Sequence, residues 1–311
     1  MLVRIVRDWT SPDLLRQTPG GSGRWGDVQF TEDPVRECDY LIALNPPPQR
    51  IKVKARRAWL ITQEPPVEEY YWHRAAFQYF DRVFTPHPVL DENVELSQGY
   101  LPWHIGKSYD ELKALSPDAD KAHRVSTVTS SAYSRPGHRA RYDLIQHLRD
   151  TDLDLELFGK GIRFVEDKYD GIAPFRYSIA IENSFYPSYW TEKITDCLLS
   201  WTMPVYSGAP DIDEYIDPAA YIAIDPHDYE GSYRRMKAAI EADEWHQRLD
   251  AIAEARRKLL DELQFFPAMV ERIAAAEANA PDSGKRKYDI PKVPRPNQRS
   301  LLERAWRKLK G

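Results

Sequence analysis

Polar side chains concentrate within residues 176–210, directly after two short apolar runs. Glu182 and Asn183 follow the run Ser178–Ile181, and the second run is Met203–Tyr206. Both runs have the length and composition of a buried strand. In open α/β sheets, ligands bind at the carboxyl ends of the strands, so polar groups placed there predict a binding site.

Between the two runs, Thr191, Glu192 and Lys193 have the pattern of a helix start. The free N–H groups and positive dipole end of a helix N-terminus suit a diphosphate. Lys193 is unfavourable for that dipole by itself, and its position makes sense if it faces an anion. Glu192 can accept hydrogen bonds from ribose or sugar hydroxyls. The alternative is an ordinary capped helix with surface charges.

Several familiar motifs are absent or misplaced. Residues 21–26 match GxGxxG, but they follow a Thr-Pro-Gly loop and precede an extended stretch, which is the wrong context for a dinucleotide site. The eight histidines show no paired metal-binding spacing, and no Asp-x-Asp follows a strand. We therefore expect no obligatory metal cofactor, with a divalent cation at most stimulatory. Cys38 and Cys197 argue against both a disulfide framework and a cysteine zinc site.

Apolar runs alternate with helical patterns along the chain, which predicts an α/β protein. The expected strands are Leu2–Val6, Tyr40–Leu44, Ala58–Thr62, Arg82–Thr85, Arg124–Thr129, Leu155–Phe158, Ser178–Ile181, Met203–Tyr206 and Tyr221–Ile224. The expected helices are Arg139–Arg149, Thr191–Ser200, Tyr229–Ala242, Glu244–Leu263 and Pro267–Ala278. A polar stretch at 107–123 divides the two series of strands. We expect domains at 1–110 and 111–280, followed by a Pro-rich linker and basic tail at 281–311.

Charge is distributed unevenly along the 311 residues. The net charge is −5, but residues 285–311 carry +8 and the remainder −13. Ser300 and Glu303 form a capping-box pattern that predicts a basic amphipathic helix, with Trp306 on its apolar face. Such a helix is typical of a membrane surface, and the alternative is a helix that packs on its own protein.

These features lead to expectations about partners and location. The basic segment 285–311 predicts contact with an anionic membrane surface. Nucleic-acid binding is not expected, because the segment is short, the body is acidic and no recognition motif accompanies it. No signal peptide or membrane-spanning run is evident, so we expect a cytoplasmic protein, peripheral on the inner face of the membrane.

The polar region also resembles a known family. Ile-Glu-Asn-Ser at 181–184, Tyr-x-Thr-Glu-Lys at 189–193 and Met-Pro-Val-Tyr-x-Gly-Ala-Pro at 203–210 are similar to the donor-binding motif of the α1,3/1,4-fucosyltransferases, glycosyltransferase family 10. That motif binds GDP-fucose. The resemblance implies that this chain contacts the donor through the matching side chains and the backbone near Thr191. The matching side chains are Asn183, Tyr189, Glu192 and Lys193.

Two looser matches imply further roles. Residues 125–131 and the following Arg139-Ala-Arg-Tyr resemble the family's strand, Ser-rich loop and helix start, where an Arg pairs with the donor phosphates. Arg139 is the matching position, with Arg135 and Arg141 as alternatives. Residues 59–66 resemble the segment that holds the family's general base, which makes Glu64 the candidate base. Pro65 replaces a Ser of that pattern, the neighbouring candidates are Glu68 and Glu69, and Glu64 as a solvated loop carboxylate is the alternative.

The resemblance implies two Rossmann-like domains facing a cleft (the GT-B type) and a soluble bacterial-type member of the family. The implied activity is inverting transfer of fucose from GDP-fucose to a glycan acceptor, in surface polysaccharide or lipopolysaccharide synthesis. Two alternatives remain at this point. One is the same scaffold with another nucleotide-sugar donor, and the other is a non-catalytic module that binds a nucleotide or glycan.

Overall fold

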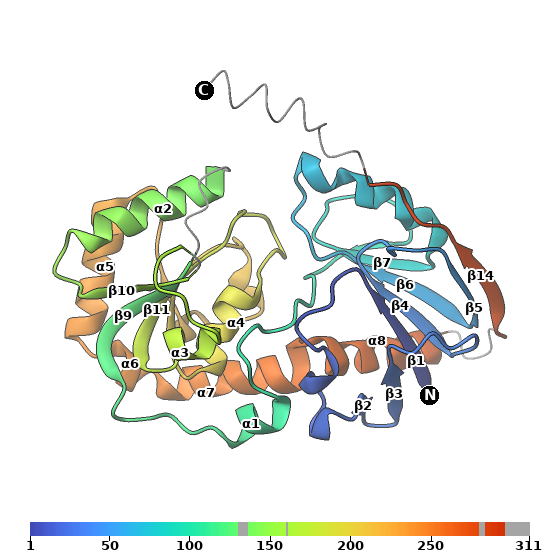
Figure 1. Ribbon diagram of the computed structural model, residues 1–311, viewed down its shortest axis with the longest axis horizontal. Coiled ribbons are helices and arrows are strands. Elements are labelled where there is room, and N and C mark those ends of the chain that lie inside the picture. The colour runs from blue at the N-terminus through green and yellow to red at the C-terminus, as the bar shows by residue number, and fades with distance from the viewer. Residues whose placement is uncertain (130–135, 160, 280–283, 296–311) are drawn as a thin grey trace.

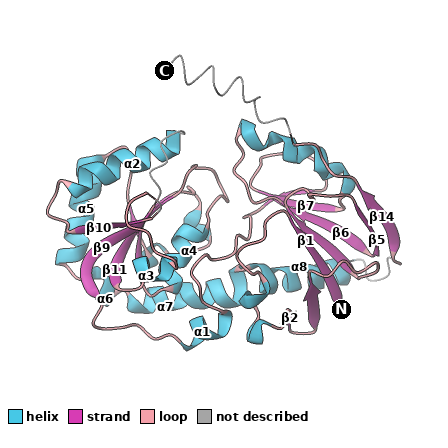
Figure 2. Ribbon diagram, in the orientation of Figure 1, coloured by secondary structure: helices cyan, strands magenta, loops and turns pink. Residues whose placement is uncertain are grey.

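The computed structural model describes residues 1–129, 136–159, 161–279 and 284–295, with 122–124 and 136 described in their backbone only. The chain forms two lobes, and each lobe has its own sheet with helices packed against it (Figure 1; Figure 2). The predicted α/β fold with two Rossmann-like domains is confirmed. The tail helix predicted from residue 300 onward lies outside the described residues.

The first domain is built on a sheet of seven strands. In sheet order these are β2 (Arg24–Trp25), β3 (Val28–Thr31), β1 (Leu2–Arg7), β4 (Tyr40–Leu44), β6 (Arg57–Ile61), β7 (Arg82–Thr85) and β8 (Val94–Leu96). All pairs are parallel except β2 with β3. Every residue of β4 is buried, because both faces of the sheet are covered, and this is why its sequence is continuously apolar.

The second domain is a parallel sheet of five strands. In sheet order these are β10 (Leu155–Phe158), β9 (Ala122–Val128), β11 (Phe175–Ile181), β12 (Met203–Ser207) and β13 (Ile222–Ala223). Its helices are α1 (Tyr109–Ala114), α2 (Pro136–Arg149), α3 (Lys168–Ile172), α4 (Glu192–Leu199), α5 (Tyr229–Glu241), α6 (Glu244–Gln247) and α7 (Leu249–Lys258). β11 is buried along its whole length, and parallel pairing with β9 and β12 brings the carboxyl ends of all three strands together.

Short helical turns complete the connections. They are 3-10 helices at Leu15–Gln17, Pro19–Gly21, Glu68–Tyr79, Ile212–Glu214 and Pro218–Ala220, and a π-helix at Leu259–Leu263. The π-helix joins α7 to α8 (Phe265–Asn279), and the two helices follow one another along the same side of both lobes (Figure 1).

The end of the described chain returns to the first domain. Phe265, Phe266 and Met269 of α8 are buried in the core formed with β1 and β4. Strand β14 (Arg286–Ile290) pairs antiparallel with β5 (Ile51–Ala55), and both help cover the other face of the sheet. The second lobe therefore does not extend to residue 280, whereas the two sheets divide between residues 96 and 122, the region that contains the predicted boundary at 110. α8 packs on the first domain because its aromatic residues face that sheet, and part of the predicted linker is a strand.

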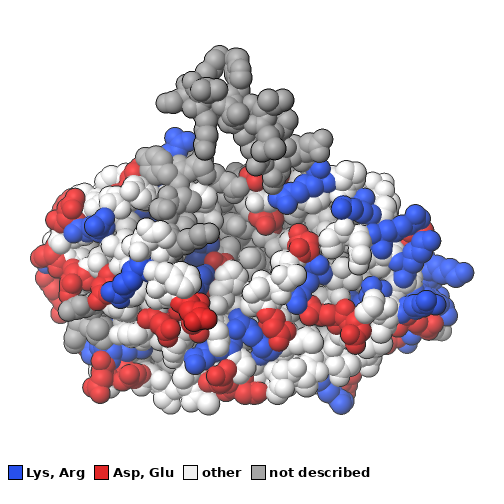
Figure 3. All heavy atoms as spheres, viewed as in Figure 1, with Lys and Arg blue, Asp and Glu red and all other residues white. Residues whose placement is uncertain are grey.

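Part of the basic C-terminal segment is neutralised by this return. Lys285 lies 3.3 Å from carboxylate oxygens of both Glu37 and Asp39, and Arg286 pairs with Asp81. Lys and Arg side chains gather at the outer edge of the first domain near β5 and β14 (Figure 3). The charge asymmetry read from the sequence thus includes basic residues that serve the fold.

Candidate nucleotide-sugar site

The site begins where β11 ends. Glu182, the first residue after the strand, is fully buried. Its carboxylate accepts hydrogen bonds from the Thr191 backbone N–H at 2.8 Å and from the Lys193 ammonium at 3.1 Å. The Thr191 hydroxyl also donates to it, at 2.8 Å. Burial raises the pKa of Glu182, and Lys193 opposes that rise. Because Glu182 is enclosed, it positions the loop and the helix start and does not face a ligand.

Gly208 is required by this arrangement. A Cβ atom at position 208 would lie 2.0 Å from the Tyr206 hydroxyl and 2.6 Å from Cγ of Glu182. The glycine after β12 therefore gives the buried carboxylate the room it needs. The sequence placed Glu182 at the end of a buried strand but did not assign it a role.

Thr191 and Lys193 begin α4 as predicted. Thr191 is the N-cap, and its hydroxyl accepts from the Lys193 backbone N–H at 3.4 Å. The Lys193 ammonium lies 3.5 Å from Glu192 in addition to its bond with Glu182, and its side chain is 20% exposed. Lys193 thus has two carboxylate neighbours and still reaches a surface that a ligand can contact.

A second lysine joins the cluster from α3. The Lys168 ammonium lies 3.3 Å from Glu192 and 3.4 Å from Asp196. Burial alone would raise the pKa of Glu192, but Lys193, Lys168 and His104 outweigh it and hold that pKa well below its usual range. Lys168 was not predicted, since no local pattern distinguishes it from other lysines.

The segment between the domains is attached to the same cluster. The backbone N–H of His104 donates to the Asp196 carboxylate at 2.8 Å, and the His104 ring lies 3.4 Å from the Lys168 ammonium. Asp196 is 1% exposed, and burial raises its pKa. The interdomain connection is therefore fixed to the first turns of α4.

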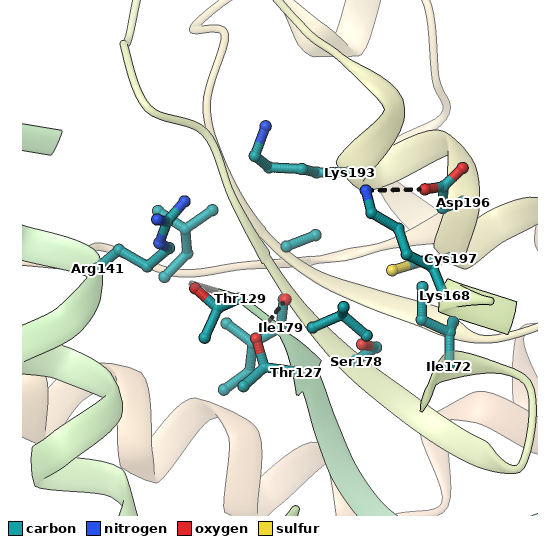
Figure 4. A pocket seen from close by; sticks show the side chains of 13 residues that line it. Thr127, Thr129, Arg141, Lys168, Ile172, Ser178, Ile179, Lys193, Asp196 and Cys197 are labelled. Carbon is teal, nitrogen blue, oxygen red and sulfur yellow. Dashed lines mark hydrogen bonds and ion pairs between the residues drawn. The ribbon is translucent and has the colours of Figure 1, made fainter. Parts of the chain in front are cut away.

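Arg141 supplies the third cation. It is buried, and its guanidinium donates to the Asn183 side-chain carbonyl at 2.7 Å. Figure 4 shows Arg141 reaching from α2 toward a pocket that Lys168 and Lys193 line from the α3 and α4 side. Asn183 is half-buried, as a group between the helix and a ligand would be. At Gly137, a Cβ atom would lie 2.1 Å from the Asn183 backbone oxygen, so α2 packs directly on this loop.

The predicted phosphate-pairing residue, Arg139, is exposed and does not line the pocket. The two arginines differ by two residues, which places them on roughly opposite sides of a helix. Arg141 has the spacing of the apolar face, because it precedes Leu144, Ile145 and Leu148 by three, four and seven residues. The helical periodicity of the sequence therefore favours Arg141 over Arg139 as the residue on the buried side of the helix. The third alternative, Arg135, lies outside the described residues.

Tyr189 connects this cluster with the first domain. It is buried in the loop between β11 and α4. Burial raises its pKa well above the usual value, and the charges of Glu182, Glu64 and Glu192 add to that rise. Since Glu64 belongs to the first domain, the Tyr189 phenol lies within electrostatic reach of both the α4 cluster and the predicted base.

Glu64 lies three residues after β6 and lines a cavity of about 290 Å³, here named the Glu64 cavity. Its other walls come from Asp8, from residues 46–48, from Tyr70, Trp72 and His73, and from Lys292, Val293 and Arg295 after β14. The competing candidates, Glu68 and Glu69, are exposed in the first turn of a 3-10 helix and do not line it. Of the three candidates, Glu64 is thus the one that lines the Glu64 cavity.

No group of three or more His, Cys, Asp or Glu side chains within the described ranges is arranged to hold a metal ion. Across those same ranges, no helix combines the length and apolar character needed to cross a bilayer.

Two packed Rossmann-like domains, with cations gathered at the carboxyl edge of the second sheet, form an arrangement that suits the phosphates of a nucleotide. Residues 119–245 match the fucosyltransferase C-terminal domain of glycosyltransferase family 10. Most of the second domain is therefore similar to that family's C-terminal domain. A fucosyltransferase-like protein of Arabidopsis thaliana is 26% identical over 121 residues, which make up 38% of this chain and 22% of that protein. The match thus spans about a fifth of that relative's length.

Solved structures share the fold across both domains. The crystal structure of an α1,3-fucosyltransferase with GDP covers 84% of this chain and 90% of its own, with a TM-score of 0.50 and 15% identity. The structure of HepE from Anabaena with UDP-glucose covers 90% of this chain and 100% of its own, with a TM-score of 0.51 and 9% identity. At these identities the likeness concerns the fold alone.

Proposed function

We propose that the protein is an inverting glycosyltransferase that moves fucose from GDP-fucose to a glycan hydroxyl. One observation carries the proposal. Arg141, Lys168 and Lys193 converge on a pocket at the carboxyl edge of the sheet in the family 10 domain. Cations fixed around one pocket suit a diphosphate, whose negative charge increases as the sugar leaves. The solved α1,3-fucosyltransferase with GDP and the family match support a guanosine donor.

We propose the following donor contacts. Lys193 and Arg141 neutralise the diphosphate, together with backbone N–H groups of the α4 start near Thr191. Asn183, held by Arg141, presents its remaining amide donors to the donor molecule. Glu192, kept ionised by two lysines, accepts hydrogen bonds from ribose or sugar hydroxyls. Tyr189 stands between the donor and the acceptor side. Arg139 remains the position implied by family resemblance, and the structure favours Arg141.

Glu64 is the proposed general base. The acceptor hydroxyl oxygen forms a bond to the anomeric carbon of fucose while the bond from that carbon to the diphosphate oxygen breaks. The electron pair of the broken bond leaves with GDP, and Glu64 takes the hydroxyl proton. Attack on the face opposite the leaving group inverts the anomeric configuration in one displacement. A positioned base contributes about 10²–10⁴ in rate.

The proposal extends to the biological setting. We place the acceptor in surface polysaccharide or lipopolysaccharide synthesis because of the resemblance to bacterial members of the family. Contact of the basic C-terminal segment with the inner face of the membrane belongs to the same proposal. Lys285 and Arg286 pair with acids of the first domain, so such contact would rest on residues further along the segment.

Calorimetric titration of the protein with GDP, GDP-fucose and UDP-glucose tests the donor site. We expect binding of both guanosine ligands, weakened about tenfold or more in Arg141→Ala and Lys193→Ala, since each loses a charge-assisted hydrogen bond. Arg139→Ala is the matched control and should bind within about twofold of the parent, as expected for an exposed charge. Selective binding of the uridine ligand would replace the donor and keep the scaffold. No nucleotide binding would refute the transferase proposal and favour a glycan-binding module.

A further inference from the structure

The Glu64 cavity has the size and lining of a site for one sugar unit. Its volume of about 290 Å³ lies at the lower end of ligand pockets, about 300–1,000 Å³. Trp72 lines it with a half-buried ring, and a flat ring can pack on the apolar face of a pyranose. The cavity is separate from the pocket that Lys193 and Arg141 line, as the two share no residue.

His73 adds a hydrogen-bonding group that the fold does not satisfy. It is 2% exposed and lines the cavity, and its Nδ1 has no hydrogen-bond partner in the described part of the chain. Burial, with the nearby His87 and Arg295, lowers the pKa of His73 to about 3, so the ring is neutral at physiological pH. Buried polar atoms without partners are uncommon, which suggests that a ligand hydroxyl completes this bond.

Two cations from the returning segment line the same cavity. Neither Lys292 nor Arg295 lies within 4.0 Å of a carboxylate among the described residues, although Asp8 and Glu64 share the cavity with them. Upstream in the same segment, Lys285 and Arg286 each have an acidic partner in the first domain.

The acids of the cavity form no ion pair within 4.0 Å with these two cations. Asp8 accepts a hydrogen bond from the Asn45 amide at 3.0 Å. Burial raises the pKa of Asp8, and the Asn45 bond and the more distant charge of Arg295 oppose that rise. Glu64 is the proposed base. The Arg295 guanidinium lies 5.9 Å from the centre of the Trp72 ring, beside the surface on which a sugar would pack. The geometry therefore leaves two cations available to a ligand in the cavity.

We propose that the Glu64 cavity is the acceptor subsite and that it selects a sugar carrying a negative group, a carboxylate or a phosphate. Lys292 and Arg295 bind that group, Trp72 packs on the ring, and His73 bonds one hydroxyl while another faces Glu64. This proposal rests on the proposed function for the role of Glu64. The selection of an anionic sugar rests on the two cations alone.

The test measures binding of matched monosaccharides to the full chain by saturation-transfer NMR titration. The probes are methyl β-glucoside, methyl β-glucuronide and the 6-phosphate of methyl β-glucoside, which separate the neutral, carboxylate and phosphate forms. The variants are Lys292→Ala/Arg295→Ala and, as a control, Lys52→Ala/Lys287→Ala. The control removes two exposed cations from β5 and β14 that do not line the cavity.

We expect at least one anionic glycoside to bind about fivefold more tightly than the glucoside, which is the preference that two exposed charges allow. The preference should weaken in high salt, disappear in the cavity variant and persist in the control variant. Three results would overturn the proposal. They are equal affinity for all three probes, no binding of any probe, and a preference for the anionic probe that persists in Lys292→Ala/Arg295→Ala. GDP titration of the same samples distinguishes the two proposals. If the parent protein does not bind GDP, the proposed donor site is refuted, and the sugar titration still tests the anionic subsite.

Discussion

Replacing Lys193 by methionine separates the structural role of this lysine from its proposed role in phosphate binding. The substitution removes the ammonium 3.1 Å from the carboxylate of Glu182, which is fully buried. At an effective dielectric constant of about 20, that attraction is roughly 5 kcal/mol. Breaking a buried pair by removing one partner typically costs about 3–5 kcal/mol. Thr191 continues to bond Glu182, so we expect a loss near the lower limit, about 3 kcal/mol in the free energy of unfolding.

The loss should depend on pH in a defined direction. Burial already raises the pKa of Glu182, and removing the nearby cation raises it further. A group whose pKa is raised in the folded state destabilises that state as the pH rises through that pKa. The deficit of Lys193→Met should therefore be smaller at pH 5 than at pH 7.5, because protonation of Glu182 removes the unpaired charge.

Chemical denaturation at both pH values measures the deficit, and the double variant Lys193→Met/Glu182→Gln supplies the control. Removing both charges should restore most of the stability, because no ionised carboxylate is left without its cation. GDP binding should stay weak in the double variant, since the ammonium is still absent. A deficit that does not change with pH, or GDP binding restored by Glu182→Gln, would refute this reasoning.

Three further predictions concern the general base Glu64, the packing around Gly208 and the dependence of stability on the ionisation of Glu192. Glu64→Gln should lower the kcat of fucose transfer about 10²–10⁴-fold and leave the affinity for GDP unchanged. Glu68→Gln should change neither kcat nor GDP affinity. A transfer assay measures the first quantity and calorimetry the second. Gly208→Ala should reduce the free energy of unfolding by about 3 kcal/mol because its methyl group meets a buried tyrosine and carboxylate, and equal stability to the parent would contradict this. Gly284→Ala, with nothing within 4 Å, is the neutral comparison. The pKa of Glu192 is held low, so its ionised form should stabilise the fold at every pH above the ordinary pKa of a glutamate. That contribution should be lost as the pH falls through the lowered pKa. The difference in the free energy of unfolding between the parent and Glu192→Gln should therefore be constant near neutral pH and become smaller only at acidic pH.

The sequence was most informative where strands are buried on both faces. β4 begins and ends as predicted, and β11 and β12 differ only at their ends, because continuous apolar runs mark such strands. β5 and β14 were not predicted. β14 is a short charged segment between prolines, and it becomes a strand only by pairing with residues more than two hundred positions earlier. No local pattern encodes a partner at that distance.

The site residues also differ in how far the sequence could predict them. Thr191 and Lys193 were found because they lie within a contiguous motif at a helix start. Lys168 and His104 come from other elements, and only the tertiary structure brings them to Glu192. For the arginine of α2, the motif suggested position 139, whereas helical periodicity placed position 141 on the buried side. Where motif alignment and periodicity disagreed, the packing of the helix followed periodicity.

The return of α8 and β14 to the first domain bears on the order in which the chain folds during synthesis. The second domain is built from one continuous stretch, so it can fold as soon as that stretch has left the ribosome. The first domain has to wait. Until α8 is made, the face of its sheet that receives Phe265 and Phe266 stays open to water. The half of the protein that is synthesised first is therefore the half that is completed last, and a chain ending before α8 would expose an apolar sheet to aggregation.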